Sequence, residues 1–348
     1  MKIAITADTH LTSYQINPER FNALRDIFVQ SEGLSVDTVL ICGDLFDKNF
    51  NNHADFEHLA NQFPRLSIWV LPGNHDIGLS KRTLVGKNIT VFEQATIIND
   101  EISFFFVPYQ HGTTMGEVIA SQIASLEPGK WVLFGHGDWL DGIREPNPLE
   151  PGTYMSLTRQ DLERYKPVRT FLGHIHAQSD GMVYYPGSPC GIDITETGVR
   201  SFLIFDSHSL SVERKPVRSD VIYQIMNLLI LPVEDEVSYL ENLVAGEIDR
   251  WALPDCDHVR VKIRVKVQGY TTDKEALSAY LTSRLKGFDF YKDEAPDLTR
   301  VAATLDLNRI KIAERVREAV DQLPIVDSPG EPDKDQIMFE SLKLIFEG

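Results

Sequence analysis

Short runs of apolar and β-branched residues recur along residues 1–217 and predict strands. The runs at 2–6, 38–42 and 67–71 each end in polar residues or glycine, which is typical of buried strands that lead into loops. Five more strands are predicted in the same part of the chain, at 102–108, 131–135, 169–173, 182–185 and 202–206.

A segment with helical periodicity lies between the run at 2–6 and the run at 38–42. A helix is predicted to begin at Pro18 with Asn17 as its N-cap, since proline fits the first helical position. Its apolar residues fall on one face, namely Phe21, Leu24, Ile27 and Phe28. A second helix is predicted from His53 to Phe63. The alternation of strands and helices predicts an α/β domain over residues 1–217.

The pattern changes after residue 217. Four elements are predicted there, namely strands at 223–231 and 258–268 and helices at 273–286 and 308–322. Residues 218–325 are therefore predicted to form a smaller α+β domain. A run rich in proline, aspartate and glycine, 326–333, predicts a linker, and an amphipathic helix follows at 335–347.

The helix in segment 326–348 is too apolar to stand free in water. Its apolar residues are Ile337, Phe339, Leu342, Leu344, Ile345 and Phe346. They either pack on the second domain or dock on a partner protein, and the sequence slightly favours packing within the chain.

Composition narrows the class of protein. The chain has 348 residues, of which 43% are hydrophobic and 24% charged, as in a globular protein with a sizeable core. No apolar run approaches the roughly 18 residues of a membrane span. The first residues run directly into the strand at 2–6 and leave no room for a signal peptide, so we expect a cytoplasmic protein without a membrane partner. Cys42, Cys190 and Cys256 form no C-x-x-C pair, which argues against disulfides.

The formal net charge of −17 argues against tight, non-specific binding of nucleic acid by this chain alone. Acidic residues are spread over both halves of the sequence, so neither half is basic. Bound divalent cations would reverse the field locally, and a partner subunit could supply DNA affinity.

Polar residues with metal-binding side chains directly follow five of the predicted strands. The motifs are Asp8-x-His10, Gly43-Asp44, Gly73-Asn74-His75-Asp76, His136 and Gly173-His174-x-His176. In open α/β sheets, ligand sites lie outside the carboxyl ends of the strands. We therefore expect these motifs to converge on one site.

The donor types of these motifs predict a metal centre. Carboxylates, imidazoles and one amide oxygen suit Mn²⁺, Fe²⁺ or Zn²⁺ better than Ca²⁺ or a thiolate site. The two imidazoles of the H-x-H motif share a face because residues i and i+2 of an extended segment point the same way. The set exceeds the needs of one ion. With Asp44 as a bridge it divides between two ions about 4 Å apart, the spacing of two-metal hydrolases.

In this order, the motifs resemble those of the calcineurin-like metallophosphoesterases, and the resemblance covers residues 1–206. It implies a four-layer α/β/β/α sandwich with two metal ions. The first ion would be held by Asp8, His10, Asp44 and His176, and the second by Asp44, Asn74, His136 and His174. His75 would act on the leaving oxygen or the transition-state charge and Asp76 would orient it. Asp47 would contact one of the metal ligands and hold it in place, without binding an ion itself.

The details are similar to the nuclease branch of this superfamily, the SbcD-type subunits of double-strand-break repair. Residues 43–47, Gly-Asp-Leu-Phe-Asp, and 73–76, Gly-Asn-His-Asp, fit that branch. Phosphoprotein phosphatases have Arg-Gly where this chain has Lys48-Asn49. Residues 107–109, Val-Pro-Tyr, and 185–189, Tyr-Pro-Gly-Ser-Pro, also resemble segments of these nucleases.

This resemblance implies a DNA endo/exonuclease that uses Mn²⁺, with Fe²⁺, Zn²⁺ or Mg²⁺ as alternatives. It further implies a capping domain at 218–325, an SbcC-like ATPase partner on whose coiled coil the C-terminal segment docks, and a homodimer. A phosphodiesterase for small substrates such as cyclic nucleotides is the alternative. A scaffold that has lost catalysis is a third reading, which the complete ligand set opposes.

Cations alternate with apolar residues in the predicted strand at 258–268. Its cations are Arg260, Lys262, Arg264 and Lys266. On a strand they would share one face, which could contact DNA phosphates. A solvated sheet face, or an edge protected by charge, explains the same pattern with fewer assumptions, and we favour that interpretation.

Overall fold

The structure is a computed structural model that describes residues 1–48, 50, 53–141, 152–233, 235–254, 259–325 and 332–347. The chain forms two compact units. Met1–Ile192 and Val199–Val221 make the first, and Asp193–Gly198 and Ile222–Gly348 the second. The division thus falls four residues after the predicted boundary at residue 217, and a short segment of the first predicted domain joins the second unit.

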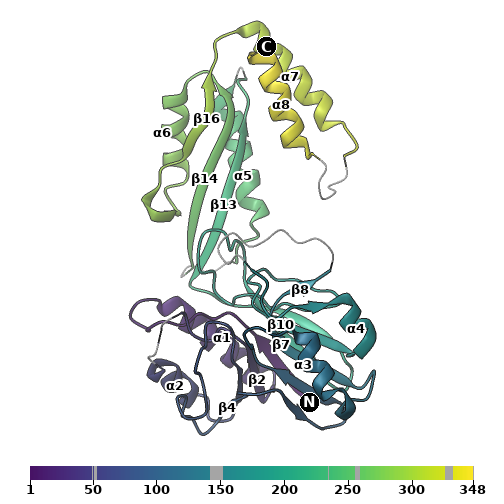
Figure 1. The fold of residues 1–348 in the computed structure, drawn as a ribbon. Coiled ribbons are helices and arrows are strands. Elements are labelled where there is room, and N and C mark those ends of the chain that lie inside the picture. The colour runs from purple at the N-terminus through teal and green to yellow at the C-terminus, as the bar shows by residue number, and fades with distance from the viewer. Residues whose placement is uncertain are drawn as a thin grey trace. The chain divides into compact units, whose positions relative to one another are not determined.

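The first unit contains a six-stranded sheet (Figure 1). Its strands, in spatial order, are β12 (Val212–Pro216), β11 (Ser201–Asp206), β1 (Lys2–Thr6), β2 (Thr38–Cys42), β3 (Ser67–Leu71) and β4 (Ile89–Val91). β1 to β4 are parallel, with Ile5 opposite Leu40, whereas β11 is antiparallel to β1. The carboxyl ends of β1, β2 and β3 therefore share one edge.

A second sheet in this unit has four strands. They are β10 (Arg169–Gly173), β7 (Trp131–His136), β6 (Ser103–Val107) and β5 (Thr96–Ile98), in that spatial order. β10, β7 and β6 are parallel and β5 is antiparallel. β8 (Trp139–Leu140) and β9 (Leu157–Thr158) form a small separate ribbon.

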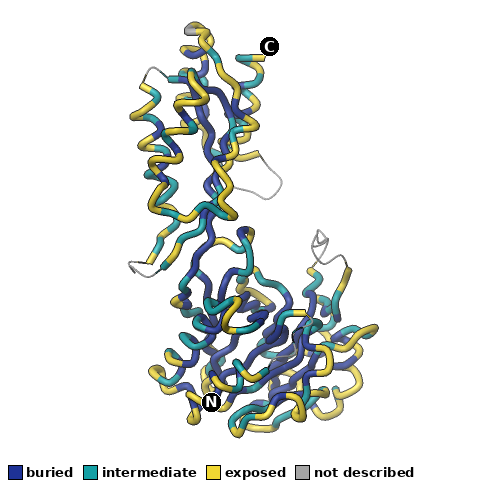
Figure 2. Tube along the Cα trace, turned by 90° about the vertical axis from the view of Figure 1, so that its left-hand side faces the viewer, coloured by how far each residue is buried: buried dark blue, intermediate teal, exposed yellow. Residues whose placement is uncertain are grey.

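Apolar packing arranges the first unit in four layers. Alternate residues of both sheets, such as Ile5 and Phe134, form the core between the sheets. The outer face of the six-stranded sheet packs on α1 (Pro18–Gly33) and α2 (Ala54–Asn61). The outer face of the other sheet packs on α3 (Met115–Gln122) and α4 (Arg159–Tyr165). The predicted α/β/β/α sandwich is confirmed, and Figure 2 shows its buried residues in dark blue.

The second unit is built around a four-stranded sheet. Its strands are β13 (Val221–Ile230), β14 (Arg260–Thr271), β15 (Asp289–Phe290) and β16 (Asp297–Ala303). One face packs on α5 (Glu236–Arg250) and α6 (Lys274–Arg284). The other face packs on α7 (Leu307–Asp321) and α8 (Lys334–Phe346), which form a helical hairpin (Figure 1).

The C-terminal helix α8 packs within the chain, as the sequence slightly favoured. Met338, Phe339 and Leu342 are buried against β13, β14 and α7. Tyr270 of β14 donates a hydrogen bond of 2.7 Å from its hydroxyl to Glu347, just after the helix. Most of the predicted linker, residues 326–331, lies outside the described part of the chain.

One local expectation is wrong. Residues 182–185 form no strand, since Tyr184 and Tyr185 make only isolated bridges, to Phe171 and Ser179. Asn17 is the N-cap of α1, as predicted, although its side chain caps no backbone amide and instead accepts a hydrogen bond from Thr12. Among the described residues, no helix is long and apolar enough to cross a membrane.

Candidate metal centre

The predicted motifs lie at the carboxyl ends of five parallel strands. Asp8, Asp44 and Asn74 follow β1, β2 and β3 of one sheet. His136 ends β7 and His174 follows β10 of the other sheet. Because the two sheets pack face to face, these ends meet at one side of the sandwich, and the structure brings the predicted ligands together there.

Several of these residues adopt a backbone conformation that L-amino acids rarely take. The angle φ is 53° at Asp8, 43° at His10, 50° at Asp44 and 96° at His174. Such conformations cost on the order of 1–3 kcal/mol each and persist where the surroundings enforce them, often at functional sites.

Glycines make the close approach of these loops feasible. A Cβ atom at Gly43, whose φ is 89°, would overlap the ring of His136. At Gly73 it would overlap Asp44, and at Gly173 it would overlap the carbonyl of Cys42. The glycine that precedes each of three ligand-bearing residues is thus required by contact with another strand end.

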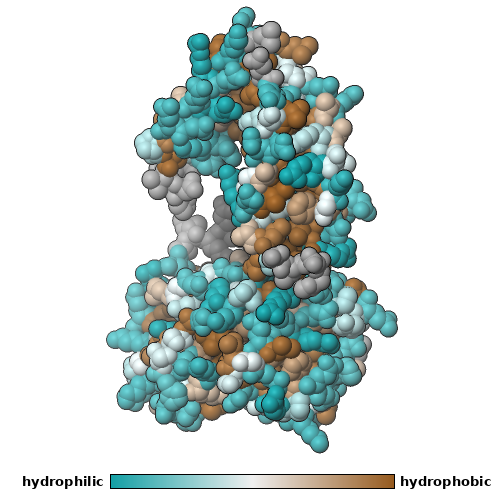
Figure 3. Space-filling model, turned by 180° about the vertical axis from the view of Figure 1, so that it is seen from behind, coloured by the Kyte–Doolittle hydropathy of each residue, from teal (hydrophilic) through white to brown (hydrophobic). Residues whose placement is uncertain are grey.

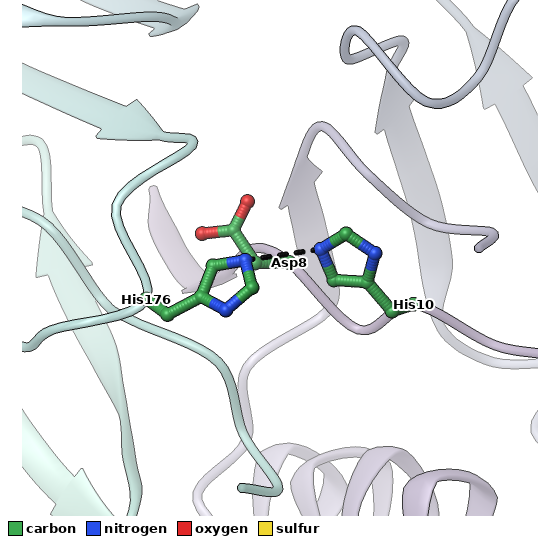
Figure 4. A group of neighbouring side chains, drawn as sticks. All are labelled: Asp8, His10 and His176. Carbon is green, nitrogen blue, oxygen red and sulfur yellow. Dashed lines mark hydrogen bonds between the residues drawn. The ribbon is translucent and has the colours of Figure 1, made fainter. Parts of the chain in front are cut away.

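Asp8, His10 and His176 form the first group of candidate ligands (Figure 4). One ligand atom from each lies within 4.8 Å of the others. Nε2 of His10 and Nε2 of His176 face each other at 3.1 Å. Oδ1 of Asp8 accepts a hydrogen bond of 2.8 Å from the amide of His174, whereas its buried Oδ2 finds no hydrogen-bond partner among the residues that the structure describes. A buried carboxylate oxygen without a donor fits a cation site.

Asp44, His136 and His174 form the second group, again within 4.8 Å of one another. Nδ1 of His136 lies 2.9 Å from the carbonyl oxygen of Cys42, to which it donates. This contact turns Nε2 of His136 toward the site, 2.8 Å from Oδ1 of Asn74. Asn74 therefore lies beside His136 of this group, and its role as a ligand stays a prediction.

Asp44 lies between the two groups. Its Oδ2 is 3.7 Å from Nε2 of His10 and 3.5 Å from Nε2 of His136. Its Oδ1 accepts a hydrogen bond of 2.9 Å from the amide of His75. One carboxylate shared by two groups of donors is the arrangement expected of a binuclear centre, and the donor set fits two divalent cations.

The ionisable groups of the site perturb one another strongly. Burial raises the pKa of Asp8 to about 6 and lowers the pKa of His10 to about 4. Burial would also lower the pKa of His136, but Asp44 and Asp8 outweigh it and raise that pKa to about 9. Burial would raise the pKa of Asp44, but His136 and His10 hold it below its ordinary value. The side chains of the cluster thus do not fully compensate the buried negative charge of its carboxylates, and bound cations would stabilise those carboxylates.

His75 lies beside both groups of ligands. Its ring meets the ring of His10 edge-on with centroids 4.8 Å apart, and it forms a third potential ligand group with His10 and Asp44. Oδ1 of Asp47 is 3.9 Å from Nδ1 of His75 and 4.0 Å from Nδ1 of His10. Both distances exceed hydrogen-bond length, so support of a ligand by Asp47 stays a prediction.

Asp76 holds two ligand loops together. Its carboxylate accepts hydrogen bonds of 3.0–3.1 Å from the amides of Leu45, Phe46 and Gly73. Burial raises its pKa to about 6, and Asp44 adds to this effect. This contact between the loops after β2 and β3 was not expected from sequence, and an action of Asp76 on the ring of His75 stays a prediction.

Sequence reasoning missed two buried arginines that hold ligand backbones. Arg20 of α1 donates from Nη1 to the carbonyl of His10 and, at 3.2 Å, to Asp47. Arg200 donates to the carbonyl of His176 and to both the carbonyl and the hydroxyl of Ser188, the last two at 2.9 Å. The position of Arg20 one helical turn before Leu24, on the apolar face of the predicted helix, was a usable signal in the sequence, whereas nothing in the sequence marks Arg200.

The cations of β14 lie in the second unit, and two of them are paired. Arg260 donates two hydrogen bonds of 2.9 and 2.7 Å to Asp289. Arg264 donates two of 2.9 and 3.2 Å to Glu294. The alternation of β14 is as predicted, since Ile263 and Val265 are buried. The pairs favour the interpretation of a solvated face, and DNA contact stays a prediction.

Comparison with known proteins places this site in a family. The calcineurin-like phosphoesterase family matches residues 1–206. The chain is also similar to YhaO, an uncharacterised metallophosphoesterase of Bacillus subtilis, with 26% identity over 212 residues that cover 55% of this chain and 50% of the relative. The chain thus spans about half the length of this curated relative.

Solved structures add little to this match. An archaeal phosphodiesterase is 17% identical and covers 62% of this chain and 100% of its own, with a TM-score of 0.33. TT1561 of Thermus thermophilus is 12% identical, covers 62% and 99%, and has a TM-score of 0.41. Yfce, a phosphoesterase from E. coli, is 12% identical, covers 63% and 100%, and has a TM-score of 0.31. The assignment therefore rests on the family match, which covers more than half of the chain and contains both ligand groups: the chain belongs to the calcineurin-like phosphoesterase family.

Proposed function

We propose that this chain hydrolyses phosphodiester bonds of DNA with two divalent metal ions. Hydrolysis by two metal ions is supported by the position of Asp44, whose carboxylate lies between two converging groups of donors. The first ion would be held by Asp8, His10, Asp44 and His176, and the second by Asp44, Asn74, His136 and His174. When bound, the cations supply Lewis-acid activation of the phosphodiester and of the attacking water. Mn²⁺ is our first choice, ahead of Fe²⁺, Zn²⁺ and Mg²⁺.

The residues of the chain position the reaction. His75 is partly accessible, with 15% of its side chain exposed, beside buried His10 and Asp44. In this proposal its imidazole donates a hydrogen bond or a proton to the leaving sugar oxygen. In this proposal Asp76 orients this ring, Asp47 supports a metal ligand, and the shared carboxylate of Asp44 keeps the two ligand groups together. Backbone amides held by Asp76 fix the loops that carry Asp44 and His75.

DNA as the substrate rests on the resemblance of the motifs at 43–47 and 73–76 to those of SbcD-type nucleases. A small diester such as a cyclic nucleotide is the second candidate, and the net charge of −17 favours it, since DNA carries a dense negative charge. An ATPase partner of the SbcC type, a homodimer and a cytoplasmic location belong to the same proposal. Exposed Leu344 of α8 leaves part of that helix available for a partner.

One experiment separates the two substrates. The purified chain, freed of metal by a chelator and reloaded with Mn²⁺, is offered single-stranded DNA, double-stranded DNA, a cyclic nucleotide and bis(p-nitrophenyl) phosphate. We expect DNA cleavage that depends on Mn²⁺ and increases when a candidate ATPase is added. Hydrolysis of the small diesters far faster than that of DNA, with or without the ATPase, would overturn the nuclease assignment and support the alternative.

A further inference from the structure

A buried carboxylate that the sequence did not single out lies beside the second ligand group. Asp138 follows His136 by two residues and is 2% exposed. Its amide donates to the carbonyl of Tyr154, and its carbonyl accepts from the amide of Leu157, both at 2.8 Å. Its Oδ2 accepts a further hydrogen bond of 2.8 Å from the amide of Tyr154. Asp138 is thus fixed in its backbone and in one carboxylate oxygen.

The residues on either side of Asp138 are held as firmly. A Cβ atom at Gly137 would lie 2.5 Å from the carbonyl oxygen of Met155 and 2.7 Å from that of Tyr154, so only glycine fits there. The hydroxyl of Tyr185 donates to the carbonyl of Gly137 at 2.9 Å and accepts from the amide of Trp139 at 2.8 Å. The carboxylate of Asp138 therefore has little freedom to turn.

The second oxygen of this carboxylate faces a predicted metal ligand. Oδ1 of Asp138 lies 3.6 Å from Nε2 of His174, and the two side chains are 3% and 4% exposed. The ring of Tyr154 packs on the ring of His174 with centroids 4.7 Å apart, at a tilt of 42°. His174 thus lies between a hydrogen-bonded carboxylate and an aromatic ring.

We infer that Asp138 is a positioning residue for His174. In the metal-bound protein its carboxylate would accept a hydrogen bond from Nε2–H of His174, and Nδ1 would then be the atom of that ring that binds the ion held also by Asp44 and His136. A carboxylate behind a ligating imidazole fixes the tautomer and orientation of the ring and makes it a stronger ligand. Asp138 acts through His174, since it belongs to none of the ligand groups found among the described residues. The inference rests on the metal chemistry of the proposed function and is independent of DNA as substrate.

Titration with Co²⁺, followed by calorimetry and visible absorption, tests this role. Wild-type protein is expected to bind two ions. In Asp138→Asn the amide oxygen can still accept from Tyr154, but the negative charge facing His174 is lost. We expect the affinity for one ion to fall about 10- to 100-fold, with an altered absorption spectrum, while the affinity for the other changes less than about twofold.

Asp141→Asn is the matched control. It removes the same charge three residues along the same segment, at a side chain that is 42% exposed and hydrogen-bonded to Arg159. Both Co²⁺ affinities should stay at their wild-type values in this variant. Unchanged affinities in Asp138→Asn, or equal weakening of both ions, would overturn the inference, since a merely structural residue would not act on one ion selectively.

A second measurement needs no variant of Asp138 to fold. In Zn²⁺-loaded wild-type protein with ¹⁵N-labelled histidine, the NMR signals of His174, assigned by their loss in His174→Gln, should show a protonated Nε2 and a coordinated Nδ1. Coordination through Nε2 would overturn the inference. Neither result depends on nuclease activity, so failure of the proposed substrate and failure of this role remain distinguishable.

Discussion

At the scale of single residues, Asp8 has several features that lower the stability of the fold. It adopts a φ of 53°, is completely buried, and keeps one carboxylate oxygen without a hydrogen-bond donor among the described residues. A residue in this position destabilises the fold unless something else binds it. Proteins tolerate such local cost where activity requires it.

The pKa of Asp8 gives a pH-dependent prediction for protein kept in a chelator. Burial raises this pKa from 3.8 to about 6, so the folded state holds the proton more tightly than the unfolded chain does. Stability is then lost as the pH rises from 3.8 through about 6. Asp8→Asn removes this loss. By calorimetry in EDTA, we expect the variant to melt above the wild type near pH 8 and together with it near pH 4, and a lower melting temperature near pH 8 would contradict the assignment.

His75 gives the sharpest prediction for catalysis. His75→Ala should reduce phosphodiester hydrolysis by about 10²- to 10⁴-fold, the usual contribution of a general acid or base. The metal content, measured by elemental analysis, should stay at the wild-type value because His75 is assigned to neither ion. His208→Ala is the control, since His208 is exposed and paired with Glu101 away from the ligand loops. Full activity of His75→Ala would refute the role.

At the scale of elements, local sequence specified the strands that carry the ligands better than the connections between them. β1, β2, β3 and β10 have the predicted bounds because buried parallel strands are short, continuous apolar runs. α5 was not predicted, although Leu240, Val244 and Ile248 recur at helical spacing. The expected strand at 182–185 failed because its pattern lacked a partner: Val183 and Tyr185 are buried, but no ladder forms beside them.

The helix α8 offers a matched pair for a stability prediction. Leu342 is 0% exposed and packs on β14 and α7, whereas Leu344 is 77% exposed on the same helix. Leu342→Ala should lower the free energy of unfolding of the second unit by about 2–5 kcal/mol, as truncation of a buried leucine does. Leu344→Ala should change it by less than about 0.5 kcal/mol. Urea unfolding checks both, and similar effects would show that α8 does not pack as described.

At the scale of the whole molecule, the negative net charge of the chain opposes binding of the proposed substrate, DNA. The net charge is −17, and hydrophilic residues predominate on the face of the molecule drawn in Figure 3. Arg260 and Arg264 are neutralised by Asp289 and Glu294. Lys262 and Lys266 are then the cations of β14 best able to bind phosphate.

These lysines give a prediction for DNA binding. Replacing both Lys262 and Lys266 by alanine should weaken DNA cleavage and lower the salt dependence of DNA binding by about one unit of slope per lost contact. Hydrolysis of a small diester should be unaffected. The control replaces two exposed lysines outside β14, Lys286 and Lys311, and carries the same change of net charge. An equal effect in both double variants would contradict a DNA contact by Lys262 and Lys266, and would show that the lysines act only through the net charge of the protein.

The sequence by itself determined the strands that end in ligands, the kinds of donor and the family to which they belong. These features are local, since an apolar run, a turn glycine and a ligand pair lie within a few residues of one another. The sequence also predicted Asp44 as the shared carboxylate. Only the tertiary structure showed that Arg20 and Arg200 hold the backbone carbonyls of His10 and His176, and that Asp138 is buried beside His174. Those contacts join strand ends and loops far apart in the chain, as Arg200 joins Ser188 to His176, and their geometry depends on the packing of two sheets. The sequence thus identifies the ligands, whereas their arrangement in space forms only when the chain folds.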